Sequence, residues 1–169
     1  MSEHRDRSTR VRLSAVLALC AVGVSLHLFA LFLLASNRDN HLVLWTGLTG
    51  GFLGATVVGL HREHRDEIDR TPALALALGG AVLAVSTVPA LVVYCTGSDP
   101  GTALRVTWYG GIDTVWGLPY PWATSVVHSG GCRAEVWPVG YLLGYPLLAW
   151  GLWYEPVVDR LVGRVAGRK

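Results

Sequence analysis

Four apolar stretches, separated by polar segments, dominate the hydrophobic pattern of this chain. None of them contains Lys, Arg, Asp or Glu, and each approaches or exceeds the roughly 20 residues that a helix needs to cross the hydrocarbon core of a bilayer. The pattern therefore predicts an all-α membrane fold, a four-transmembrane-helix bundle that forms one polytopic domain over residues 1–169. We expect the spans at residues 13–35, 42–60, 72–94 and 136–154.

The connections between these stretches differ in length. The first two are short, which favours antiparallel neighbouring helices in a bundle. The third, residues 95–135, is a long loop in which two β-prone runs, 104–109 and 112–116, flank Gly110-Gly111. Because glycine reaches the positive φ of tight hairpin turns, this arrangement predicts a small β-hairpin within the loop.

The tail after the last stretch, residues 155–169, has valines and a leucine at helical spacing with arginines on the other side. Such a segment is typical of an amphipathic helix lying on the membrane surface. A simple continuation of the fourth helix is the alternative.

The predicted spans contain regularly spaced glycines and two prolines. The spacing G-x-x-x-G predicts close helix packing, which we expect to lie within the bundle, although a dimer face or a moving gate would use the same spacing. Within the predicted spans it occurs three times, at Gly47/Gly51, Gly50/Gly54 and Gly140/Gly144. Pro89 and Pro146 each lack a backbone donor, so we expect kinks in the third and fourth helices.

Basic residues are distributed unequally about the spans. Eleven Lys and Arg lie in the N-terminal tail, the second connection and the C-terminal tail, against three in the first connection and the long loop. Since cytoplasmic segments carry the excess of positive charge, we predict a plasma-membrane protein with both termini cytoplasmic and the loop 95–135 extracellular.

Composition supports the membrane assignment. The chain is 51% hydrophobic and only 15% charged, whereas soluble domains have about 25% charged residues. Its net charge of +2 is not gathered with aromatic residues into a basic patch, so the bilayer is the expected partner and nucleic acid is not.

The cysteines offer a structural and a redox interpretation. Cys95 and Cys132 lie at the two ends of the predicted extracellular loop, where an oxidising environment favours a disulfide that clips the loop. The alternative is a membrane thiol–disulfide oxidoreductase that uses the same pair. The topology resembles quinone-linked disulfide oxidoreductases and, more distantly, vitamin K epoxide reductases, which also carry a C-x-x-C pair that this chain lacks.

Histidines provide the other candidate sites. His27 lies near the middle of the first predicted span, where an ionisable side chain is costly and is therefore a candidate functional residue. It would be a haem ligand or a substrate contact in a small carrier, or else a hydrogen-bonded structural residue. His61 and His64 share a helix face beside acidic residues, but their spacing matches no known metal motif. We therefore expect a solvated turn there, with no metal.

The loop also carries a proline-stiffened aromatic segment. The run Gly117-Leu-Pro-Tyr-Pro-Trp122 resembles a stretch in small uncharacterised four-span membrane proteins of archaea, a resemblance that implies no activity, cofactor or catalytic residue. We expect these side chains to form an interaction surface, made of Trp108, Trp116, Pro119, Pro121 and Trp122. The sequence thus favours a non-enzymatic accessory, assembly or interaction component that meets a membrane or exported protein.

Overall fold

The computed structural model describes residues 2–65, 68–91, 93–95, 105–108, 113–115, 118–120, 125–129 and 132–166. Its helices are α1 (Ser2–Ser36), α2 (Arg38–His64), α3 (Arg70–Thr87), the 3₁₀-helix η1 (Val88–Leu91), α4 (Pro138–Trp153) and α5 (Pro156–Ala166). Its strands are β1 (Val93–Cys95), β2 (Arg105–Trp108), β3 (Asp113–Val115), β4 (Leu118–Tyr120), β5 (Ser125–Ser129) and β6 (Cys132–Val136).

Three helices are long and apolar enough to cross a membrane. These segments are Thr9–Leu34, Arg38–His64 and Arg70–Leu91. Their outward faces carry large apolar side chains such as Phe32 and Val43, which are 62% and 73% exposed. Apolar surface of this extent is unfavourable in water and favourable in lipid, so these faces fit a bilayer.

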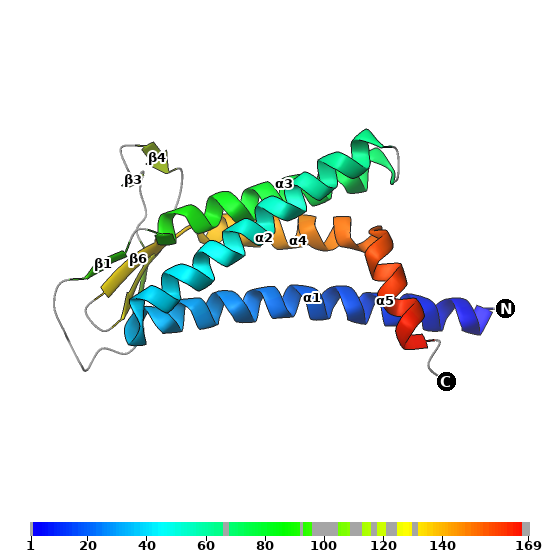
Figure 1. Ribbon diagram of the computed structural model, residues 1–169, viewed down its shortest axis with the longest axis horizontal. Coiled ribbons are helices and arrows are strands. Elements are labelled where there is room, and N and C mark those ends of the chain that lie inside the picture. The colour runs from blue at the N-terminus through cyan, green and yellow to red at the C-terminus, as the bar shows by residue number, and fades with distance from the viewer. Residues whose placement is uncertain are drawn as a thin grey trace.

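The long helices run side by side, with the strands at one end and both chain termini at the other (Figure 1). We call these the sheet end and the terminus end of the bundle. α3 packs against both α2 and α4, while α1 contacts α2, α4 and α5. The core lies between these helices and is formed largely by Leu34, Trp45, Phe52, Leu76, Leu83 and Leu148.

Glycines allow the close approach of α3 to its neighbours. A Cβ atom on Gly79 would lie 2.5 Å from the backbone nitrogen of Leu148, and one on Gly59 would lie 2.6 Å from that of Ala77. Gly144 contacts the Leu83 side chain, so packing at the Gly140/Gly144 pair agrees with the sequence expectation. Backbones in such contact gain dispersion energy that longer side chains would prevent.

The glycines at the centre of α2 do not pack inside the bundle, and the expectation for Gly47/Gly51 and Gly50/Gly54 is wrong. A Cβ on any of these four would meet nothing within 4 Å. The reason is helical geometry: α2 buries the face that carries Trp45, Phe52 and Gly59, seven residues apart, and the four glycines lie on the opposite side. We call Gly47, Gly50, Gly51 and Gly54 the open glycine face.

Two predicted helix boundaries shift at the sheet end. The third span was expected to reach residue 94, but α3 ends at Thr87, continues as η1 and gives way to strand β1. Pro89 explains the change, because it has no N–H for the helical ladder. Conversely, α2 begins at Arg38, where a loop was expected, because the Asn37 side chain caps it by accepting from the Asn40 N–H at 3.1 Å.

Four strands form an antiparallel sheet in the order β1-β6-β5-β2, and β3 pairs with β4. The predicted pairing of residues 104–109 with 112–116 is wrong, because β2 pairs with β5 and β3 with β4. Gly110 and Gly111 lie outside the described residues. In this arrangement β2 on β5 extends the larger sheet, while β3 and β4 form a separate two-stranded one.

The tail forms a separate helix rather than a continuation of α4. The chain turns at Tyr154 and Glu155, and α5 crosses α1 near its N-terminal end (Figure 1). Val158 is buried in this crossing, while Arg160 and Arg164 are exposed. The amphipathic helix predicted from the sequence is therefore present, and part of its apolar face packs on the protein.

Candidate functional site

The break between α3 and η1 leaves backbone carbonyls that side chains from other helices satisfy. The Trp45 indole Nε1 donates to the Thr87 carbonyl at 2.6 Å, and the Tyr141 hydroxyl donates to the Ser86 carbonyl at 2.9 Å. The hydroxyls of Thr49 and Thr87 lie 2.6 Å apart. Irregular backbone at membrane depth needs such partners, because lipid provides none.

His41 completes this arrangement at the sheet end. Its ring nitrogens lie 2.6 Å from the Ala30 carbonyl oxygen and 3.2 Å from the Ala90 carbonyl oxygen, and the side chain is fully buried. Either tautomer of the neutral ring donates one of these bonds, and the protonated ring donates both. His41 thereby joins α1, α2 and η1. Sequence reasoning placed it in a loop and missed it, although the capping signal at Asn37 marks the helix start that positions it.

His27 joins α1 to α4. Its Nδ1 lies 2.6 Å from the Tyr145 hydroxyl oxygen, and Gly23 leaves room for that tyrosine, since a Cβ there would lie 3.1 Å from the same oxygen. The imidazole also contacts the rings of Trp45, Phe52 and Tyr141.

The other ring nitrogen of His27, Nε2, has no hydrogen-bond partner within the described part of the chain. The side chain is only 7% exposed, so Nε2 is enclosed among the aromatic rings. A haem or a carried substrate at this atom would have to displace one of them. The contacts favour the structural alternative, in which His27 is a hydrogen-bonded anchor between helices.

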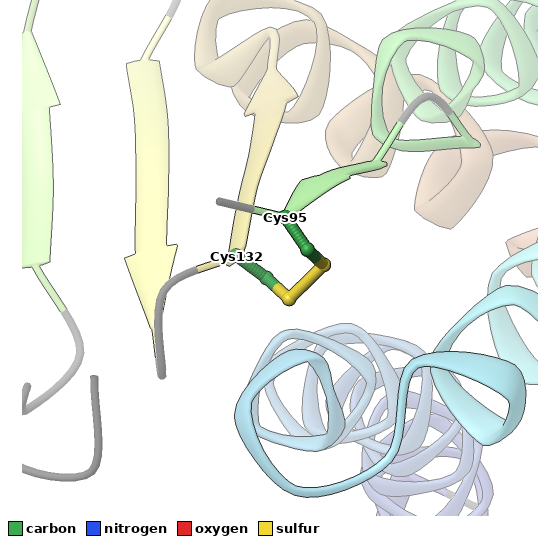
Figure 2. The surroundings of a disulfide bond; sticks show 2 residues. All are labelled: Cys95 and Cys132. Carbon is green, nitrogen blue, oxygen red and sulfur yellow. A yellow bond between two sulfur atoms is a disulfide. The ribbon is translucent and has the colours of Figure 1, made fainter. Parts of the chain in front are cut away.

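Cys95 and Cys132 form a disulfide bond (Figure 2). They are directly opposite each other on the neighbouring strands β1 and β6, so the bridge fastens the two ends of the long connection. The third cysteine, Cys20, lies on α1 and is partly buried.

Removing this disulfide should loosen the sheet end. We expect Cys95→Ala with Cys132→Ala to lower the free energy of unfolding by about 4 kcal/mol, the loop-closure value for a cross-link over some 38 residues. Thermal unfolding of the purified protein would measure the change. Cys20→Ala is the control, since it removes a thiol that closes no loop. A variant as stable as the wild type would contradict a structural role for the bridge.

The residues predicted to form an interaction surface fall into two groups. Trp108 lies on β2 and Pro119 on β4. Trp116, Pro121 and Trp122 lie outside the described residues. The surface itself therefore stays a prediction.

Charged side chains gather at the terminus end. Glu155, which is 3% exposed, lies between α4 and α5 with Oε1 3.4 Å from Nη2 of Arg62. Arg12 pairs with Asp159 at 3.2 Å and fastens α5 to α1. These buried or bridging charges join four helices, and sequence reasoning had treated them as tail and loop residues.

The histidine pair His61 and His64 lies beside this cluster. Glu63, which lies between His61 and His64 in the sequence, forms an ion pair with Arg70 at 3.5 Å. Within the described residues, no three His, Cys, Asp or Glu side chains are grouped to hold a metal ion.

Comparisons with protein-family models, curated proteins and solved structures find no match to this chain. The resemblances to archaeal four-span proteins and to membrane oxidoreductases therefore remain predictions. Function has to be argued from the geometry of the helices and their contacts.

Proposed function

We propose that the protein is a four-span, non-enzymatic component of a membrane assembly and that it binds a transmembrane helix of another subunit through the open glycine face of α2. The observation that carries the proposal is the contrast among its glycines. Gly59, Gly79, Gly80 and Gly144 each contact a neighbouring helix, whereas all four residues of the open glycine face have clear space around them.

An open glycine face is well suited to binding a helix in lipid. Apolar side chains gain little by associating in the bilayer, so close backbone contact supplies the attraction. Two overlapping G-x-x-x-G spacings, Gly47/Gly51 and Gly50/Gly54, give a groove along nearly two helical turns. Within the bundle, helix α3 already uses glycines in this way, and α2 presents the same kind of surface outward.

The packing of α4 supports a fourth span. α4 has 16 residues, which at 1.5 Å per residue extend about 24 Å. It contacts α3 along its length, from Gly140 against Ser86 to Gly151 against Leu76. Two helices packed over this distance lie at the same depth, so α4 crosses the bilayer if α3 does. This topology leaves both termini on the positively charged, cytoplasmic side and the disulfide-linked sheet outside.

A bulky residue on the open glycine face should release the partner without unfolding the chain. We expect Gly51→Leu to abolish the complex, because the partner backbone can no longer approach. The measurement is the mass of the complex after extraction in lipid nanodiscs, which also distinguishes a second copy from a different chain. Gly163→Leu is the matched control, since Gly163 on α5 also has nothing within 4 Å.

Two results would refute the proposal. One is a wild-type chain that is extracted alone from its native membrane. The other is a complex of unchanged mass and amount in Gly51→Leu. A complex that is lost equally in Gly163→Leu would also count against it, because the effect would then not be specific to α2.

A further inference from the structure

Helix α5 lies across the terminus end of the bundle, at the depth where the apolar span of α1 begins. It turns away from α4 and crosses α1 (Figure 1). At the crossing, Asp159 pairs with Arg12 at 3.2 Å, and α1 contains no Lys, Arg, Asp or Glu after Arg12. The Arg12 guanidinium also lies 5.4 Å from the centre of the Trp153 ring in α4. In a bundle that crosses the bilayer, these contacts place α5 at the boundary between headgroups and hydrocarbon.

An apolar face of α5 remains uncovered by the bundle. Val158 is buried in the crossing, whereas Val157 and Leu161 are 46% and 42% exposed. Val157 and Leu161 are four residues apart and therefore share one face of the helix. Two aromatic side chains at the end of α4, Trp150 and Tyr154, are 54% and 46% exposed. Aromatic rings of this kind gather where helix ends meet lipid headgroups, so they mark the same depth independently.

Two arginines border the exposed apolar face. Arg160 and Arg164 each follow one of its two residues by three positions, so they lie beside the same face. Both are exposed, and neither has an ion-pair or hydrogen-bond partner in the described part of the chain. Asp159, the acidic residue of α5, lies on the other side of the helix and is paired with Arg12. The exposed side of α5 therefore carries two uncompensated positive charges.

The adjoining segments do not cancel this charge. Residues 2–8, at the start of α1, contain two carboxylates and two arginines. Residues 167–169, after α5, contain one arginine, one lysine and no acidic residue. The charge beside the exposed face is therefore positive whether or not these segments are counted.

We infer that α5 binds anionic phospholipids of the leaflet in which it lies. Val157 and Leu161 enter the acyl boundary of that leaflet. The two arginines extend from the border of the same face to the phosphates, as long basic side chains do at membrane interfaces. An interfacial helix binds through its buried apolar area and its attraction to anionic lipid, and each arginine near an anionic surface adds to that attraction.

The inference rests on the four-span topology proposed above and is independent of the partner helix. The open glycine face lies on α2, outside α5. Gly51→Leu should therefore leave lipid binding by α5 unchanged. Loss of the partner complex and loss of lipid binding are separate results.

The first test locates the apolar face of α5. A nitroxide label is attached at Leu161→Cys in a Cys20→Ala background, where the two remaining cysteines are bonded to each other. In nanodiscs of phosphatidylglycerol and phosphatidylcholine, this label should collide mainly with oxygen, which concentrates in hydrocarbon. Gly163→Cys is the matched control: it is exposed, lies on the other side of α5 and should collide mainly with a water-soluble nickel chelate.

The second test measures lipid selectivity by native mass spectrometry of the delipidated, purified protein. The probes are phosphatidylglycerol and phosphatidylcholine, which share a phosphate but differ in net charge. We expect phosphatidylglycerol to be retained preferentially, and Arg164→Gln to weaken its binding about fivefold, the loss expected for one interfacial arginine. Arg70→Gln, at a side chain that is 81% exposed, removes one positive charge outside α5 and should change binding less than twofold.

Each contrary result overturns the inference. Equal access of the nickel chelate to labels at residues 161 and 163 would mean that α5 lies in water. A label at residue 161 shielded from both oxygen and nickel would mean that a protein covers this face. Equal losses in Arg164→Gln and Arg70→Gln would mean diffuse attraction to the surface, and equal retention of the two lipids would exclude selection for anionic headgroups.

Discussion

Replacing Gly79 with alanine should strongly destabilise the folded protein. The added Cβ would lie 2.5 Å from the backbone nitrogen of Leu148 and 3.0 Å from the Gly144 carbonyl oxygen. Both are backbone atoms in α4, so no side-chain rotation can relieve the contact and α3 and α4 must separate. We expect the free energy of unfolding to fall by about 3 kcal/mol or more, the upper range for overpacking. Thermal unfolding in detergent and the yield of monodisperse protein would measure it.

Gly50→Ala is the matched control for this prediction. It is the same substitution on a neighbouring helix, but a Cβ there meets nothing within 4 Å. Since alanine is the better helix former, stability should be unchanged or slightly raised. Similar losses in the two variants would show that glycine matters through chain flexibility and not through contact between α3 and α4.

Replacing Arg62 with glutamine should also destabilise the protein strongly. It leaves the Glu155 carboxylate, which is 3% exposed, without its ion-pair partner at the junction of α2, α4 and α5. Removing one member of a buried pair costs about 3 kcal/mol, because the remaining charge is desolvated and uncompensated. The free energy of unfolding, measured with and without the substitution, tests this value.

A second substitution reveals the cause of the loss. Adding Glu155→Gln to Arg62→Gln removes the stranded charge, so the double variant should recover most of the stability. Arg70→Gln is the control for a surface pair and should cost no more than about 1 kcal/mol. If the double variant is as unstable as Arg62→Gln alone, the lost packing of the arginine and not the charge is responsible.

The helices at membrane depth follow from sequence because their signal is simple. An apolar run without charges has one favourable arrangement in lipid, so α1, α2 and α3 lie where the pattern predicts them. The link between Cys95 and Cys132 was also predictable, since both residues flank one long connection. The helices depend on local sequence, and the disulfide depends on a single pair of cysteines.

The contacts that join the helices were harder to foresee. His41 falls in the short connection predicted before the second span, yet it is buried between the Ala30 carbonyl of α1 and the Ala90 carbonyl of η1, the short helix that contains Pro89. Glu155 begins the predicted amphipathic tail, yet its side chain is only 3% exposed. Polar residues at helix ends look alike in sequence, and only the folded neighbours decide which ones are buried.

The glycines also show that sequence does not predict which helices come into contact. The spacing of Gly47/Gly51 and of Gly140/Gly144 is identical, but one pair faces away from the bundle and the other faces α3. A G-x-x-x-G motif indicates that another helix can approach closely, but it does not indicate which helix. The larger side chains of α2 decide which face packs. Trp45 and Phe52 are buried in the bundle, so the glycines on the other side of α2 face outward.

The contacts of α1 set an order of events during biosynthesis. α1 leaves the ribosome first, but His27 bonds to Tyr145 and Arg12 pairs with Asp159, residues near the end of the chain. These two contacts of α1 therefore form only after α4 and α5 have been made. Until α4 and α5 have been synthesised, the surface of α1 that they later cover has no partner from these helices.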